Sequence, residues 1–452
     1  MLPLPTLFSI ADALKQGRTT SRALTESCLE KIADDAGEGK RAFIKVYGEA
    51  ALKAAIASDK ARAEGSGDIP SVLAGIPISI KDLFDVAGEP TPAGSIFDFA
   101  PARADATAIA RLRSAGVIII GRTNMTEFAY GAHGTNCHYG TPLNQFDRTN
   151  KRIVGGSTSG GAVSVTDGFA AATVGSDTGG SVRIPAALCG LAGYKPTQAR
   201  VPLTGAFPLS HTRDSIGPLG ASAACCVLLD AAMAGHAIKL PSPAHLRGVN
   251  FGVPTNILFD QLAPEVERDV ERALSSLSTA GAKIHEFRFQ ELQDELDGSQ
   301  AANFSGYEGY QLHHERLATN LEKFDPWVSK RLLLGAKMSD VDYQKIVILR
   351  QKLMASANKT TAGFDALVAP TVPIIAPTLA DLTASDESFY RFNTLLLRNT
   401  APFNVFDRPA WSLPCHREGA APVGLMVVGE TGGDEKLQRI GLAVESALRH
   451  GR

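Results

Sequence analysis

The chain has 452 residues, of which 44% are apolar, and it carries 45 Lys and Arg against 47 Asp and Glu. This length and apolar content suffice for a substantial buried core and exclude a largely disordered chain. The formal net charge of -2 gives no overall attraction to polyanions, and no long run of Lys and Arg supplies a local basic patch for nucleic acid.

The cysteines and the first residues indicate the cellular setting. The six cysteines are scattered, without the spacing of a zinc site or a CxxC motif, which favours free thiols in a reducing compartment. The apolar start is broken by Pro3 and Pro5 and has no basic residue before Lys15, unlike a signal peptide. No apolar run is long enough to cross a membrane. We therefore expect a cytoplasmic protein without a membrane partner.

The first part of the chain predicts helices followed by buried strands. Ser9 and Ser21 are expected to cap two short amphipathic helices. The apolar run 76–80 predicts a buried strand, and a helix near 105–114 precedes a second buried strand at 117–120. A helix leading into an apolar strand is typical of layered α/β structure.

The rest of the chain continues this alternation. The segment 162–172 predicts a helix, or a helix running into a strand, rather than a flexible linker. Residues 290–360 are polar and helical, and we expect them to form a lid or cap. Further strands are predicted at 249–253, 283–289, 366–369, 410–414 and 423–428, and further helices at 265–280 and 435–448.

Glycine is concentrated between 151 and 181, where eight of the 43 glycines lie. Residues 155–161 read GGSTSGG and residues 175–185 read GSDTGGSVRIP. Glycine-rich turns can direct several backbone N–H groups to one point, which suits an anion or an oxyanion. A nucleotide phosphate loop requires a lysine that neither segment contains, so a nucleophilic serine is the better interpretation.

A nucleophilic serine needs a base. His133, His138 and His211 are the nearest histidines, but none lies in a recognised triad motif. Lys81 follows the buried strand at 76–80, where burial would lower its pKa and leave the amine neutral. A surface lysine paired with Asp82 is the structural alternative.

Five ordered segments resemble the amidase signature family: 75–82, 121–129, 155–161, 175–185 and 190–197. Weaker similarity follows at 366–371 and 422–425. The resemblance implies an α/β fold in which helices cover both faces of a large, twisted, mixed sheet. It implies one domain over 1–452, divided into an N-terminal helical region (1–70), a signature core (71–220), a helical substrate-side region (290–360) and a C-terminal α/β part (361–452).

The resemblance implies a Ser-cis-Ser-Lys triad. Ser181 would be the nucleophile, Ser157 the bridging serine after a cis peptide bond, and Lys81 the base. Ser159 is a second candidate for the bridge because it lies in the same cluster, but the 24-residue step from Ser157 to Ser181 matches the family spacing.

The same resemblance implies an oxyanion hole and a support for it. Asp177 and Arg183 would fix the loop around the nucleophile through charge-assisted hydrogen bonds, and an ordinary structural ion pair is the alternative. The expected oxyanion donors are the backbone N–H groups of Thr178, Gly179, Gly180 and Ser181.

The implied reaction is hydrolysis of a small-molecule carboxamide through an acyl-enzyme, releasing ammonia or an amine, with no metal and no cofactor. The alternatives within the family are the glutaminase subunit of a tRNA-dependent amidotransferase and a hydrolase of allophanate or carboxybiuret. A non-enzymatic scaffold is disfavoured because all three triad residues are present. We expect no direct nucleic-acid partner, and a homodimer is left open.

The chain departs from the family pattern at two places near its end. Residues 404–409 read NVFDRP, with Asp407 where relatives commonly have glycine, and Met426 stands where they often have glutamine. These departures leave the proposed triad intact and place the wall of the substrate pocket in question.

Overall fold

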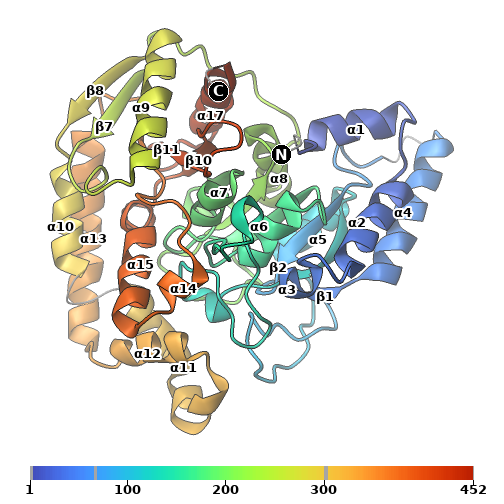
Figure 1. Ribbon diagram of the computed structural model, residues 1–452, viewed down its shortest axis with the longest axis horizontal. Coiled ribbons are helices and arrows are strands. Elements are labelled where there is room, and N and C mark those ends of the chain that lie inside the picture. The colour runs from blue at the N-terminus through green and yellow to red at the C-terminus, as the bar shows by residue number, and fades with distance from the viewer. Residues whose placement is uncertain (1–3, 66–68, 300–303, 451–452) are drawn as a thin grey trace.

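An eleven-stranded mixed β-sheet runs through the computed structural model, which describes residues 4–65, 69–299 and 304–450 (Figure 1). The strand order is β1-β3-β2-β4-β6-β5-β10-β11-β9-β7-β8. The strands span Phe43–Val46 (β1), Pro77–Lys81 (β2), Ile118–Thr123 (β3), Ala172–Ser176 (β4), Ala192–Lys195 (β5), Ile216–Gly220 (β6), Asn250–Pro254 (β7), Lys283–Phe287 (β8), Ala366–Pro370 (β9), Ala410–Pro414 (β10) and Gly424–Val428 (β11).

The part of the sheet that carries the signature segments is buried on both faces. Strand β2 pairs in parallel with β3 on one side and β4 on the other, and every residue of the three strands is buried. A strand covered on both faces has a continuous apolar run rather than an alternating one, and this explains the pattern at 76–80.

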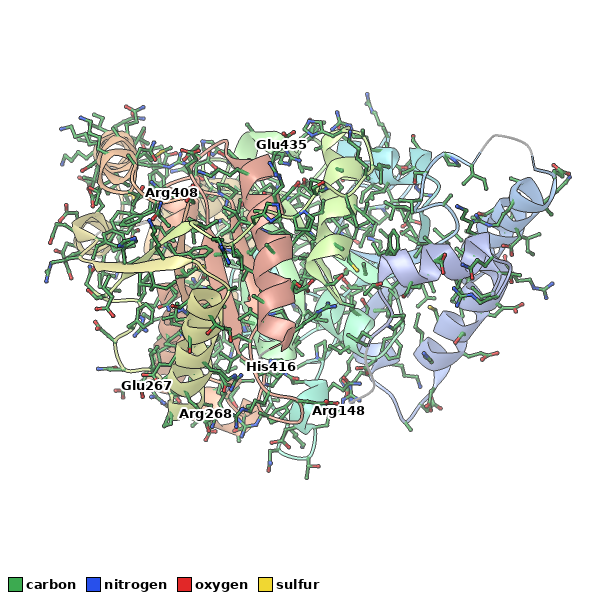
Figure 2. All side chains as sticks on the ribbon, turned by 90° about the horizontal axis from the view of Figure 1, so that it is seen from above. Arg148, Glu267, Arg268, Arg408, His416 and Glu435 are labelled. Atoms are coloured by element: carbon green, nitrogen blue, oxygen red, sulfur yellow. The ribbon has the colours of Figure 1, made fainter. Side chains whose placement is uncertain are left out.

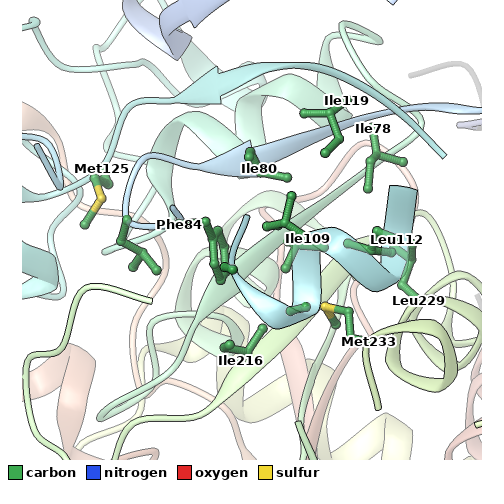
Figure 3. Close-up of a cluster of buried hydrophobic side chains, with 14 of the residues drawn as sticks. Ile78, Ile80, Phe84, Ile109, Leu112, Ile119, Met125, Ile216, Leu229 and Met233 are labelled. Atoms are coloured by element: carbon green, nitrogen blue, oxygen red, sulfur yellow. The ribbon is translucent and has the colours of Figure 1, made fainter. Parts of the chain in front are cut away.

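Helices cover both faces of the sheet, as expected. Helix α5 (Thr107–Ser114) and helix α8 (Ala223–Ala234) pack together on one face, where Ile109 and Leu229 join Ile80 of the sheet in one apolar cluster (Figure 3). Helix α6 (Ser159–Thr166) packs against β4, and its apolar residues form a separate cluster. The mixed α/β fold is therefore confirmed.

Some of the remaining helices lie at the two ends of the sheet, whereas α7 (Arg183–Cys189) and α17 (Asp434–His450) pack against central strands. Figure 1 shows α1, α2 and α4 at the β1 end, and α10 and α13 at the β8 end. The other α-helices span Leu7–Lys15 (α1), Ser21–Ala33 (α2), Gly39–Ala42 (α3), Gly48–Ala63 (α4), Pro264–Thr279 (α9), Gln290–Ser299 (α10), Phe304–Thr319 (α11), Pro326–Gly335 (α12), Asp340–Thr360 (α13), Leu379–Leu382 (α14), Asp386–Arg398 (α15) and Pro402–Val405 (α16).

Helix α9 illustrates why the amphipathic pattern was predictive. Val266 and Val270 face the core, whereas Glu267 and Arg268 project outward (Figure 2). An apolar stripe at helical spacing buries one side of the helix and leaves the other side to water. None of the helices within the described ranges is both long and apolar enough to span a membrane.

Several element boundaries differ from the sequence-based expectation. Thr6 and Thr20, not Ser9 and Ser21, cap the first two helices, because a cap must precede the first helical residue. Ser9 Oγ instead accepts a hydrogen bond from the Thr6 N–H and completes a capping box. The segment 162–172 ends helix α6 and reaches the first residue of β4.

Candidate active site

Lys81 is the last residue of β2 and is fully buried. Its Nζ lies 2.7 Å from Ser157 Oγ and 3.0 Å from Ser176 Oγ. Burial lowers the pKa of the Lys81 ammonium to about 7, although the negative charges of Asp177 and Asp214 oppose this shift. A substantial fraction of the amine is therefore neutral near pH 7 and can accept a proton.

The structural alternative for Lys81 does not hold. Asp82 pairs instead with Arg122, whose Nε lies 2.8 Å from Asp82 Oδ1, and both side chains are buried. Among the described residues Lys81 has no carboxylate ion partner, and its buried amine forms hydrogen bonds with the Ser157 and Ser176 hydroxyl groups.

Ser157 follows a cis peptide bond from Gly156, as the resemblance implies. A Cβ atom at Gly156 would lie 2.6 Å from Gly134 N, so only glycine fits this turn. Ser159 begins helix α6, and its buried hydroxyl has no hydrogen-bond partner in the described part of the chain. The structure brings Ser157, and not Ser159, to Lys81.

Ser181 lies in the turn between β4 and α7, is 5% exposed and lines a cavity. Gly180 before it has a φ of 134°, and a Cβ atom there would lie 2.2 Å from Thr400 Oγ1. Only glycine combines this backbone conformation with this close approach. The structure contains the hydrogen bond between Lys81 and Ser157. Among the described residues, no hydrogen bond joins Ser157 to Ser181.

A buried network holds the loop that leads to Ser181. Arg183 binds Asp177 with two parallel hydrogen bonds, Nη2 to Oδ1 at 2.9 Å and Nε to Oδ2 at 3.0 Å. Asn404 donates to both Asp177 O and Oδ1 at 2.9 Å and accepts from Arg183 Nη2 at 2.7 Å. Burial opposes ionisation of Asp177, but the charge and hydrogen bonds of Arg183, together with the Lys195 charge and the Asn404 hydrogen bond, hold the pKa of this carboxyl well below its usual range.

The expected oxyanion donors differ in their surroundings. The Gly180 N–H donates to Asp177 Oδ1 at 2.8 Å, so the protein itself already uses this donor. The Thr178 hydroxyl donates to Asp214 Oδ1 at 2.5 Å, which fixes the start of the loop. Counting only acceptors within the described ranges, none is found for the backbone N–H groups of Thr178, Gly179 and Ser181.

The three histidines considered as bases lie elsewhere. Burial lowers the pKa of His133 to about 3, with a smaller contribution from a nearby arginine. His138 Nε2 lies 2.9 Å from Glu127 Oε1. His211 is exposed, and its Nδ1 lies 3.5 Å from Glu308 Oε2. None of these histidines is among the residues that line the cavity beside Ser181.

The cavity beside Ser181 has a volume of about 550 Å³, which suits a small molecule. Residues 129–131 and the loop residues Thr178, Gly179 and Ser181 are part of its lining. Helices α10, α11, α12 and α15 supply much of the remaining lining. Part of the helical segment 290–360 therefore borders the same cavity as the candidate nucleophile.

Sequence reasoning missed three supporting side chains. Ser176 is the last residue of β4, and its hydroxyl accepts a hydrogen bond from Lys81 Nζ. The available signal was a polar residue at the end of a buried strand. Asp214 is buried and accepts hydrogen bonds from Thr178 and from the N–H groups of Leu209 and Ser210. Asn404 was noted only as part of the departing segment.

The two places where the sequence departs from the family pattern, residues 404–409 and Met426, do not line the cavity. Asp407 has a φ of 51° and keeps the left-handed conformation that glycine would adopt. Its Oδ1 accepts a hydrogen bond from Gln198 N at 2.8 Å. Met426 contacts Arg183 Nη1 through its sulfur, at 3.5 Å. Met426 therefore contacts the network around Asp177, Asp407 contacts Gln198, and neither residue lines the cavity.

No group of three or more His, Cys, Asp or Glu side chains within the described ranges is arranged to hold a metal ion. All six cysteines are free thiols, as predicted.

Comparison with known proteins places this geometry in context. The sequence model of the amidase family matches residues 23–437. The 2-amino-5-chloromuconic acid deaminase of Comamonas testosteroni is 33% identical over 451 residues, covering 98% of this chain and 96% of the relative. A glutamyl-tRNA(Gln) amidotransferase subunit from Chloroflexus aggregans is 32% identical, covering 97% and 96%. A solved amidase structure superposes with a TM-score of 0.87 at 35% identity, covering 98% of this chain and 99% of the other.

Proposed function

The chain belongs to the amidase signature family and is a hydrolytic amidase, and we propose that it cleaves the C–N bond of a small carboxamide with a Ser181–Ser157–Lys81 triad. The observation that carries this proposal is the 2.7 Å contact between the buried Lys81 amine and Ser157 Oγ. A lysine with a pKa near 7 is suited to act as a base at neutral pH.

The proton would travel in two steps. Neutral Lys81 accepts the proton of Ser157 while Ser157 accepts the proton of Ser181, whose oxygen attacks the amide carbon. When the tetrahedral intermediate collapses, the proton returns through Ser157 to the leaving nitrogen, which departs as ammonia or an amine. Water then hydrolyses the ester on Ser181 by the same route.

The N–H groups of Thr178, Gly179 and Ser181 would stabilise the oxyanion. Gly180 is left out of this set because its N–H is held by Asp177. The network of Asp177, Arg183 and Asn404 supports the role by keeping the loop in one geometry, and preorganised donors need no rearrangement during the reaction.

Ammonia release by the purified chain tests this function. The chain should release ammonia from at least one of a panel of aliphatic, aryl and ureido amides, and Ser181→Ala should release none. Glutaminase is the second candidate, because several relatives are named as components of glutamyl-tRNA(Gln) amidotransferase. Activity that appears only with glutamine and added partner proteins would favour that candidate and overturn the stand-alone amidase.

A further inference from the structure

The cavity beside Ser181 is strongly basic. Four cationic side chains line it, against the single carboxylate of Glu295. The cationic residues are Arg213, Arg331, Lys337 and Arg398. Much of the remaining lining is apolar or aromatic, including Leu296, Leu334 and Tyr307. A basic cavity with apolar walls concentrates anionic ligands and strengthens their interaction with fixed cations.

Arg331 on helix α12 is the cation best prepared to bind a ligand. Its Nη1 donates to Tyr130 O at 2.7 Å, and its guanidinium lies 4.1 Å from the centre of the Tyr130 ring. These two contacts hold the plane of the guanidinium. No Asp or Glu of the described residues forms an ion pair with Arg331, and a guanidinium has five N–H donors, so most of its hydrogen-bonding capacity is unused.

Arg398 is bound to several protein acceptors, and Arg213 lies near carboxylates. Arg398 donates to Asn399 Oδ1, to Asp260 O and to Leu258 O. Arg213 donates to the Ser305 hydroxyl; burial lowers the pKa of Arg213, and the nearby Glu295 and Glu308 partly oppose that shift. Both contribute positive charge to the cavity, but their guanidinium groups are already bound to the protein or near its carboxylates.

We infer that the substrate carries a carboxylate in addition to its amide, and that Arg331 binds this carboxylate while Ser181 attacks the amide carbon. The inference rests on the proposed amidase function and adds the substrate class. A planar guanidinium fits a carboxylate through two parallel hydrogen bonds, and this fixes the substrate's orientation as well as its position. The reaction converts an amido acid and water into a diacid and ammonia.

Two amido acids and their neutral isosteres test this specificity. Succinamate and glutaramate are compared with 4-methylpentanamide and 5-methylhexanamide, in which an isopropyl group replaces the carboxylate. We expect Arg331→Gln to lower kcat/KM for the amido acids by about 10- to 100-fold, the loss of a charge-assisted pair. The neutral amides should change by less than about threefold, because the same variant keeps its nucleophile and base.

Lys330→Gln is the matched control. Lys330 is the adjacent residue of the same helix, carries the same charge and pairs with Asp386 at 2.7 Å, and it is not part of the cavity lining. This variant should leave both substrate pairs unchanged. Equal losses by Arg331→Gln on acidic and neutral amides, or a wild-type protein without preference for the amido acids, would overturn the inference.

Binding without turnover separates this inference from the proposed function. Calorimetry of Ser181→Ala with succinate and glutarate should give a Kd that Arg331→Gln weakens at least about tenfold and Lys330→Gln does not. If diacids bind in this way and no amide is hydrolysed, the specificity stands and the amidase proposal fails. If ammonia is released but neither diacid binding nor kcat/KM depends on Arg331, the amidase stands and the carboxylate inference fails.

Discussion

Replacing Lys81 with methionine should stabilise the protein while removing its activity. Lys81 is fully buried, and its pKa is about 7 in the folded chain against ~10.4 in an unfolded chain. Between these values the unfolded chain binds the proton more tightly than the folded protein does. This difference costs the folded state roughly 4 kcal/mol at pH 7, and less as the pH rises toward 10.

Methionine has a similar length and carries no charge, so Lys81→Met removes this cost. It also removes the contacts of the amine with Ser157 and Ser176, which offsets the gain by about 1–3 kcal/mol. We therefore expect the free energy of unfolding at pH 7 to rise by roughly 1–3 kcal/mol in the variant.

Urea unfolding of both proteins at several pH values measures this effect. The variant's advantage should be largest at pH 7 and below, and should shrink by about 1.4 kcal/mol for each pH unit between roughly pH 7.5 and 9.5. All other titrating groups are shared, so they cancel in the difference. An advantage that does not change with pH over this range would refute a lowered pKa at Lys81.

The remaining predictions concern activity and the loop. Because neutral Lys81 is the active form, kcat/KM should rise with pH and level off above about pH 7. At pH 5 it should be roughly 100-fold below this plateau. A flat profile over this range would exclude Lys81 as the base. Ser157→Ala should lower kcat by about 10²–10⁴-fold, whereas Ser159→Ala, at a hydroxyl without a partner in the described chain, should stay within about threefold; the reverse order in an ammonia-release assay would move the bridge to Ser159. Gly180→Ala should lower the free energy of unfolding in urea by about 1–3 kcal/mol, because Gly180 has a φ of 134° and a Cβ there would meet Thr400. The control Gly363→Ala adds its Cβ in open space and should cost less. Equal stabilities of the two variants would contradict the loop geometry.

The fold was predictable where the sequence carries long or regular apolar patterns. The run 76–80 and the amphipathic α9 are clear because each follows from burial on a defined face. Strands β5 and β6 were not predicted, because they are short and contain glycine or proline, and only pairing with neighbouring strands makes them regular.

The candidate site was predictable only in part. The motifs identified Lys81, Ser157 and Ser181, and the contact between the first two joins residues 76 positions apart. The role of Asp214 at Thr178 and the position of Arg331 in the cavity depend on tertiary packing, which a local pattern does not encode. The use of the Gly180 N–H by Asp177 is likewise a matter of loop geometry.

Covalent capture at Ser181 tests the proposed mechanism most directly. Intact-mass spectrometry after rapid acid quench of the protein with p-nitrophenyl esters of succinic and butyric acid should show one added acyl group, and peptide mapping should place it on Ser181. The acyl group should be absent from Ser181→Ala and form much more slowly in Lys81→Met. Acylation of another residue, or an unchanged yield in Ser181→Ala, would contradict the assignment of Ser181 as the nucleophile.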